Sequence, residues 1–210
     1  MQRNLILALA FGAMIFGCSD APTDDKQNAK QQAILDMKRA TDFHSFSKPD
    51  EAQVTHLNWS ASVDFENRTI TGTATYDVRC AEDAQRIVFD TRDLAISLVE
   101  VDGKTVEFVM GTEQPFIGQP LSIPVTGTSK QVSIHYSTAA DAEALLWVEG
   151  DSPFLFTQSQ AILARTWVPC QDSPGIRFTY HATVQVPENL MALMSATNPT
   201  EKSANGTYTF

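Results

Sequence analysis

The alternation of apolar and polar residues with a period of two constrains the fold of this chain more than any other feature. It is clearest at residues 70–78 and 178–186. Successive side chains of a β-strand point to opposite faces, so each segment is expected to be a strand with one buried face. The apolar members are Ile70, Gly72, Ala74, Tyr76 and Val78, then Phe178, Tyr180, Ala182, Val184 and Val186. The alternation therefore predicts a β-sheet framework.

Turn-forming dipeptides separate these segments from further short strands. Asp102-Gly103 stands between the apolar stretches 98–101 and 106–110, and this connection is typical of a type I′ hairpin, whose two residues both have positive φ. Asn67-Arg68 and Asn205-Gly206 are also expected to be turns. Further strands are expected at 63–65, 87–89, 94–101, 121–125, 132–136, 154–156 and 207–210. About ten short strands and almost no helix indicate an all-β fold, a sandwich or saddle of twisted antiparallel sheets.

The composition fits a globular protein and argues against a nucleic-acid partner. The chain has 210 residues, of which 43% are hydrophobic and 19% are charged, which suffices for one large domain with its own core. The formal net charge is −10 and the isoelectric point is near 4.7. Such an acidic surface repels phosphate backbones, so we expect no binding of nucleic acid.

The first residues predict a bacterial lipoprotein signal peptide at residues 1–17. Arg3 provides a positive charge, Leu5–Phe16 is an apolar run too short to span a bilayer, and the small Gly17 precedes Cys18. We therefore expect lipidation of Cys18, which would anchor the protein to a membrane without spanning it. The alternative is an ordinary secretory signal in which this cysteine is incidental. Ser19 in place of an aspartate favours the outer membrane of the cell envelope, on the periplasmic side.

The remainder divides into a polar tether at residues 18–50 and a β-domain at residues 51–210. The tether shows no sustained apolar pattern, and His44 within it belongs to no motif. We expect the tether to be flexible and to lift the domain off the membrane. The domain contains Cys80 and Cys170, which could pair in the oxidising envelope, although two buried free thiols are favoured.

The chain lacks the sequence motifs of a self-contained catalytic site. No histidine is followed by glutamate, and no two histidines stand four residues apart, so the HExxH motif of zinc peptidases is missing. The nucleophile motif G-x-S-x-G and the phosphate-binding P-loop are missing too. We therefore predict no catalytic residue and no metal site in these 210 residues.

Several short motifs along the domain carry a family resemblance. They are Gln158-Ser159-Gln160-Ala161, Pro169-Cys170-Gln171-Asp172, Val186-Pro187, 192–196, 89–96 and 101–108. The segment from Gln158 to Asp172 is the most specific, and the matches upstream of it are weaker. These motifs resemble the N-terminal domain of the M1 zinc aminopeptidases, in the branch of leukotriene A4 hydrolase. The resemblance implies a β-saddle domain that packs against a thermolysin-like zinc domain. The GxMEN and HExxH motifs of that domain would lie beyond Phe210. The expected strand at 207–210 is cut off as it begins, which would leave an unpaired edge, so the β-domain is expected to be incomplete.

The candidate site residues are Gln158, Ser159 and Gln160. If the preceding strand continues through them, the two glutamines share one face and Ser159 points to the other. A neutral amide supplies both a donor and an acceptor, which suits a free α-ammonium group and a peptide backbone. From the residues alone, two exposed glutamines at a strand end are the simpler interpretation. The resemblance implies instead that this segment lines the substrate cleft beside the zinc domain.

The loop that follows is interpreted as structural. Pro169 and Pro174 restrict the backbone, and Asp172 is expected to close an Asx-turn. Cys170 has no histidine placed to activate it as a nucleophile. Arg165 and Trp167 suit a domain interface, but a core or surface position remains equally open.

Two functions follow from these observations. In the first, the chain is the N-terminal substrate-cleft domain of an aminopeptidase that removes amino-terminal residues from peptides. Its zinc, bound outside this chain, would polarise the scissile carbonyl and activate water, and the chain alone would be inactive. In the second, the chain is a stand-alone β-sandwich binding lipoprotein without chemistry of its own.

The lipid anchor generates the first testable prediction. Metabolic labelling with a fatty-acid analogue should mark the protein, and the Cys18→Ser variant should lose both the label and membrane fractionation. Cys80→Ser serves as the control and should keep both. Label retained on Cys18→Ser would refute acylation at this cysteine.

Overall fold

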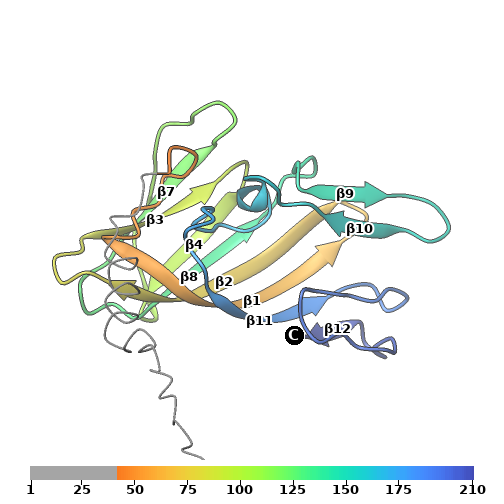
Figure 1. Cartoon of the computed structure of the whole chain (residues 1–210). Coiled ribbons are helices and arrows are strands. Elements are labelled where there is room, and N and C mark those ends of the chain that lie inside the picture. The colour runs from red at the N-terminus through yellow and green to blue at the C-terminus, as the bar shows by residue number, and fades with distance from the viewer. Residues whose placement is uncertain (1–41) are drawn as a thin grey trace, which may run out of the picture. The chain divides into compact units, whose positions relative to one another are not determined.

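The computed structural model describes residues 42–210 (Figure 1). The predicted signal peptide, Cys18 and residues 18–41 of the predicted tether lie outside the described residues. The described part consists of strands in three sheets and one short 3-10 helix, η1 (Ala164–Thr166). Within residues 42–210, no helix is long and apolar enough to cross a membrane. The predicted all-β fold is confirmed.

The largest sheet has seven strands in the order β12-β11-β1-β2-β8-β4-β5. Their bounds are β1 Ala52–Asp64, β2 Thr69–Cys80, β4 Ala95–Val101, β5 Lys104–Thr105, β8 Gln131–Ser137, β11 Thr179–Gln185 and β12 Thr207–Thr209. The pairs are antiparallel except β1–β11, which run parallel with His56 opposite Thr179. The predicted antiparallel sheets are confirmed, and this parallel pair is an addition that the sequence did not predict. The long connection between the two strands, unlike a tight hairpin, allows a parallel direction.

Two smaller sheets complete the fold (Figure 1). One has the order β3-β7-β6 and the other pairs β9 with β10. Their bounds are β3 Arg86–Thr91, β6 Val109–Met110, β7 Gln119–Pro124, β9 Leu145–Val148 and β10 Phe154–Thr157. The sequence analysis did not predict β9.

The Asp102-Gly103 hairpin is confirmed, but its second strand is shorter than expected. Asp102 and Gly103 have φ values of 49° and 74°, as a type I′ turn requires. The Asp102 carboxylate also accepts hydrogen bonds from the backbone N–H groups of Lys130 and Gln131. Strand β5 ends at Thr105, and Val109–Met110 pairs with β7 in another sheet.

The core lies between the inner face of the large sheet and the β3-β7-β6 sheet. Tyr76 and Ile134 from the large sheet and Phe89 and Leu121 from the smaller one are completely buried. The rings of Tyr76 and Phe89 lie 5.1 Å apart between centroids. Burial of each such side chain contributes about 1.5–3 kcal/mol. The period-two pattern therefore places apolar side chains inward and polar ones outward.

Residues 42–50, which the sequence analysis assigns to the flexible tether, contact the domain. Ser45 Oγ and the backbone N–H of Phe46 donate hydrogen bonds to the buried carboxylate of Asp90, both at 2.6 Å. The domain therefore begins earlier than the predicted residue 51. Composition could not show this, because the contacts are to a partner more than forty residues away in sequence.

The Tyr76 hydroxyl generates the second prediction. It donates a 2.6 Å hydrogen bond to the carbonyl of Pro169 in the core, so Tyr76→Phe leaves a buried carbonyl without its partner. We expect a loss of about 1–3 kcal/mol in the free energy of unfolding, measured by urea denaturation. Tyr180→Phe is the matched control, because the Tyr180 hydroxyl has no hydrogen-bond partner among residues 42–210. Equal losses in the two variants would contradict the role of the Tyr76 hydrogen bond.

Candidate functional site

The three candidate residues follow directly after β10, which ends at Thr157. The strand does not continue through them, so the condition for the predicted shared strand face is not met. The Gln158 backbone N–H instead donates to the Ala144 carbonyl at 2.8 Å, and the Gln160 N–H donates to Gln158 Oε1 at 3.0 Å. Both glutamines are nevertheless exposed and Ser159 is half-buried. The segment is a hydrogen-bonded turn whose two amides face solvent.

Ser159 attaches this turn to the core. Its hydroxyl accepts a 3.0 Å hydrogen bond from the Trp167 indole N–H, and its carbonyl accepts one from the Leu163 N–H at 2.9 Å. The Trp167 ring packs edge-on against the Trp59 ring of β1, with centroids 5.3 Å apart. The Gln160–Ala161 peptide bond is cis. Through Ser159 and Trp167, the segment is therefore held against β1 of the large sheet.

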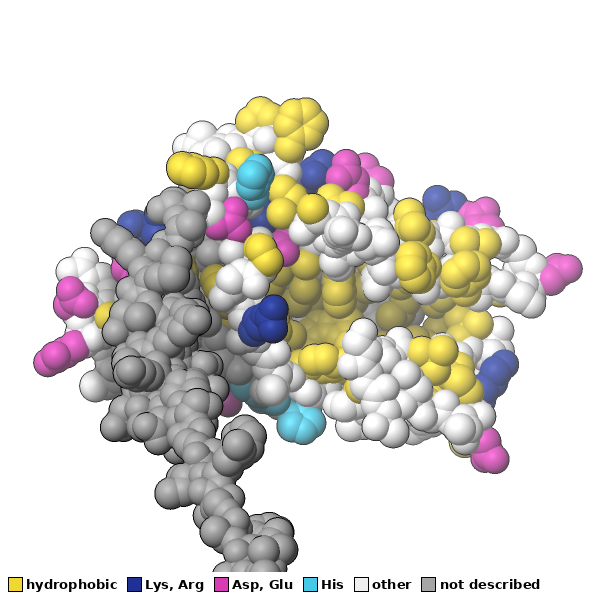
Figure 2. Space-filling view, in the orientation of Figure 1, with side chains coloured by type: hydrophobic (Ala, Val, Ile, Leu, Met, Phe, Trp, Pro, Cys, Tyr) yellow, Lys and Arg dark blue, Asp and Glu magenta, His cyan; other side chains and the backbone are white. Residues whose placement is uncertain are grey.

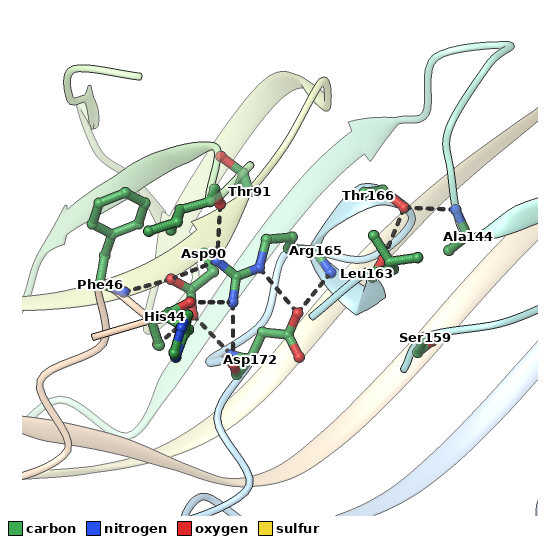
Figure 3. A network of polar contacts seen from close by, with 12 residues as sticks. His44, Phe46, Asp90, Thr91, Ala144, Ser159, Leu163, Arg165, Thr166 and Asp172 are labelled. Atoms are coloured by element: carbon green, nitrogen blue, oxygen red, sulfur yellow. Dashed lines mark hydrogen bonds and ion pairs between the residues drawn. The ribbon is translucent and has the colours of Figure 1, made fainter. Parts of the chain in front are cut away.

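The 3-10 helix η1 lies at the centre of the polar network that supports the segment (Figure 3). Thr166 in this helix accepts a hydrogen bond from the Ala144 N–H at 3.2 Å, while the Ala144 carbonyl binds Gln158. Ala144 therefore connects η1 to the candidate site through its two backbone groups. The position of η1 determines where the exposed amides lie.

Arg165 in η1 is completely buried, and its guanidinium bonds to four segments. It forms ion pairs with Asp172 at 3.0 Å and with Asp90 at 3.7 Å. It also donates to the backbone carbonyls of Ile117 and His44, both at 2.8 Å, and of Asp172 at 3.1 Å. Arg165 therefore lies in the core, which is one of the positions that the sequence left open for it. A guanidinium has five N–H donors in a planar fork, which suits it to such a junction.

Asp90, which is also completely buried, is the second charged group of the network (Figure 3). Its carboxylate accepts hydrogen bonds from Ser45, Phe46 and the Asp172 N–H. Burial raises the pKa of the Asp90 carboxyl, while Arg165 and these hydrogen bonds act in the opposite direction. No local pattern in the sequence marks this residue, which lies in an ordinary strand.

The loop after η1 has the structural role that its sequence predicts. Gln171 is buried, accepts from the Val54 N–H at 3.0 Å and donates to the carbonyls of Ala52 at 2.9 Å and Val88 at 3.3 Å. Its amide thereby joins β1 to β3. The carboxylate of Asp172 binds Arg165 rather than forming the predicted Asx-turn. The residue two positions on is Pro174, which has no N–H to donate, and the buried guanidinium requires a counterion.

The surroundings of the two cysteines in the described region disfavour the thiolate form. Both Cys80 and Cys170 are free thiols. Burial is the main cause that raises the pKa of each thiol above its ordinary value, which disfavours the reactive thiolate.

The residues present do not form a zinc site of the peptidase type. Among residues 42–210, no three His, Cys, Asp or Glu side chains are grouped so that they could hold a metal ion. A catalytic zinc site needs three protein ligands and one open position.

The buried network generates the third prediction. Arg165→Met removes the only cation that the structure places between Asp90 and Asp172 within the described region, and leaves buried carboxylates uncompensated. We expect a loss of about 3–5 kcal/mol in the free energy of unfolding, measured by urea denaturation. Arg86→Ala is the control, since its 3.7 Å pair with Glu51 is exposed and should contribute less than about 1 kcal/mol. A loss no larger than that of the control would contradict the central role of Arg165.

Comparison with known proteins identifies the family. The Peptidase M1 N-terminal domain profile matches residues 53–210. Leukotriene A-4 hydrolase of Xenopus laevis is 38% identical over 174 residues, covering 77% of this chain and 29% of that protein. Leucine aminopeptidase 2 of Candida albicans is 32% identical over 153 residues, covering 71% of this chain and 24% of that protein. The chain thus spans less than a third of the length of these relatives.

Solved structures show the same fold. Yeast LTA4 hydrolase in complex with bestatin superposes with a TM-score of 0.70 at 22% identity, over 87% of this chain and 30% of that one. An M1 zinc metallopeptidase from Deinococcus radiodurans has a TM-score of 0.60 at 21% identity, over 76% of this chain and 38% of that one. Together with the profile match over residues 53–210, these similarities show that the chain belongs to the M1 peptidases as an N-terminal domain of that family.

Proposed function

We propose that this chain is the N-terminal substrate-cleft domain of a zinc metallo-aminopeptidase that removes amino-terminal residues from peptides. Family membership supports the reaction class, because relatives that match this chain are leucine aminopeptidases. A related M1 zinc metallopeptidase from Deinococcus radiodurans is known bound to a Tyr-Ser-Ala substrate. The zinc and its ligands would come from sequence outside these 210 residues.

The arrangement of residues 158–160 supports this proposal, because their backbone is bonded to the core while the glutamine side chains are exposed. Ser159 and the backbone of Gln158 are tied to the core through Trp167 and Ala144. The side-chain amide of Gln160 makes no hydrogen bond within the described residues and is exposed. Anchoring of the backbone removes part of the conformational entropy that binding would otherwise cost, and the unpaired side-chain amide keeps its donors and acceptor available to a ligand.

The hydrogen bonds also distinguish the two glutamines. Gln158 Oε1 already accepts from the Gln160 N–H, so Gln158 chiefly offers its NH₂ donors to a peptide carbonyl. The side-chain carbonyl oxygen of Gln160 is free to accept a hydrogen bond from the α-ammonium group of a substrate. We therefore assign the amino-terminal contact to Gln160 and a backbone contact to Gln158.

An apolar face beside the site supports a partner domain. On one face of the β9–β10 hairpin, Leu146 pairs with Phe156 and Val148 pairs with Phe154, and all four are 42–52% exposed. Figure 2 shows hydrophobic side chains exposed in this part of the molecule. On the other face, Trp147 and Leu155 pack against the core. Since the relatives are more than three times longer than the matched region, we propose that the zinc domain covers this apolar face.

We further propose that the protein is held in the cell envelope by a lipid on Cys18. The sequence motif around Cys18 supports this location. Such an enzyme would act on peptides at the membrane surface.

The substrate contact generates the fourth prediction, which applies to the complete enzyme. Gln160→Ala removes a hydrogen bond to a charged group, which costs roughly 1.5–3 kcal/mol. The kcat/KM for an aminoacyl anilide should therefore fall about 10- to 100-fold. A rise in KM alone would mean equal binding of ground and transition states, and a fall in kcat would mean that Gln160 orients the peptide.

The control for this experiment is Gln85→Ala. Gln85 is an exposed glutamine before β3, and its backbone carbonyl accepts from the Val125 N–H, a bond that the substitution retains. Both variants should keep the zinc content and melting temperature of the parent enzyme. An unchanged kcat/KM in Gln160→Ala would remove the substrate role of this residue.

A further inference from the structure

The outer face of the seven-stranded sheet carries an imidazole pair that the peptidase function does not use. His56 on β1 and His181 on β11 come from the two strands that run parallel. His181 Nδ1 and His56 Nε2 are 3.0 Å apart, and the ring centroids are 5.0 Å apart. The side chain of His181 is exposed and that of His56 is half-buried. Two ligand nitrogens thus meet at the solvent-accessible surface.

A third side chain orients the pair. His56 Nδ1 lies 2.7 Å from Thr179 Oγ1, so the hydroxyl holds this ring by the nitrogen that does not face His181. In metal sites of proteins, a hydrogen bond of this kind to the non-ligating nitrogen fixes the orientation of a histidine and leaves the other nitrogen for the metal. Thr179 would therefore orient the His56 ring from outside the coordination sphere when His56 Nε2 binds a metal.

The spacing of the two nitrogens is compatible with binding to one metal ion. Two nitrogens that are each about 2.0–2.1 Å from a metal are roughly 2.9 Å apart at a 90° angle and roughly 3.3 Å apart at the tetrahedral angle. The observed 3.0 Å is the length of a hydrogen bond between the rings, and a small movement of either ring would meet both values. The intrinsic preference of imidazole sites among divalent metals, which is strongest for Cu²⁺, then decides which ion is favoured.

The surroundings suit a hydrated cation. Asp77 stands opposite His56 in the β1–β2 register, so the neighbouring strand carries a negative charge at this level of the sheet. His181 also borders a shallow depression of about 230 Å³, whose lining includes Asn58, Thr75 and Thr183. Hydroxyl and amide groups there can bond to water molecules that complete the coordination shell.

We propose that His56 and His181 form a binding site for one divalent transition-metal ion, with Cu²⁺ favoured over Ni²⁺ and Zn²⁺. Each imidazole contributes one nitrogen, Nε2 of His56 and Nδ1 of His181, and water supplies the other ligands. The proton that lies between the two nitrogens moves through solvent to an outer ring nitrogen, so both rings stay neutral. With only two protein ligands, this site differs from a catalytic zinc centre.

The test uses the whole 210-residue chain and Cu²⁺ alone in a non-coordinating buffer. Calorimetric titration should give one ion per chain with a dissociation constant in the micromolar range. The electron paramagnetic resonance spectrum should be axial, with coupling to two imidazole nitrogens. His181→Ala and His56→Ala should each weaken binding by about tenfold or more, and Thr179→Val should weaken it by about tenfold while both imidazoles remain.

His135→Ala is the matched control. His135 lies on the same sheet face but contacts Thr73 and Glu100 instead of another histidine, so its removal should leave the affinity and spectrum unchanged. His181→Asn, at an exposed position, tests the site again if His56→Ala lowers the melting temperature. Affinity unchanged in both His181 variants would overturn the proposal, as would a spectrum with fewer than two imidazole nitrogens. Neither result bears on Gln160, whose role is measured by peptidase kinetics.

Discussion

The buried cation of Arg165 is the interaction on which the rest of this domain depends. Its guanidinium joins the segment at His44, the loop at Ile117 and the loop at Asp172, and pairs with Asp90 on β3. Burying charge is costly unless every group is paired, and here two carboxylates and three backbone carbonyls share one guanidinium. Loss of this one side chain would affect all these segments together.

Arg165 also affects the position of the candidate site, because Thr166 and Trp167, which follow it in the sequence, are connected to that segment. Thr166 is hydrogen-bonded to the backbone of Ala144, which is hydrogen-bonded to the backbone of Gln158. Trp167 is hydrogen-bonded to Ser159. The exposed amides therefore project from a segment fixed at several points. A backbone that is fixed before the ligand arrives loses little entropy on binding, so only the glutamine side chains remain to be ordered by the ligand.

The two faces of the large sheet have separate uses because adjacent side chains point in opposite directions. The inward face forms the core with Phe89 and Leu121, which keeps β1 and β11 in fixed register. The outward face is free to carry polar groups, and the fixed register brings His56 close to His181. The β9–β10 hairpin keeps this alternation, but its outward residues are apolar, which our proposal explains by a second domain that covers them.

The sequence by itself determined most of the strands and their buried faces, though not β9, together with the Asp102-Gly103 turn and, through the motifs around residues 158–172, the family. These features depend on local periodicity, turn chemistry and short motifs. Only the tertiary structure decided the parallel pairing of β1 with β11, the contacts of residues 42–50 and the burial of Arg165 against Asp90. The partners of these interactions lie far apart in the chain, and local patterns determine which face of a strand is buried without specifying which distant segment lies against it.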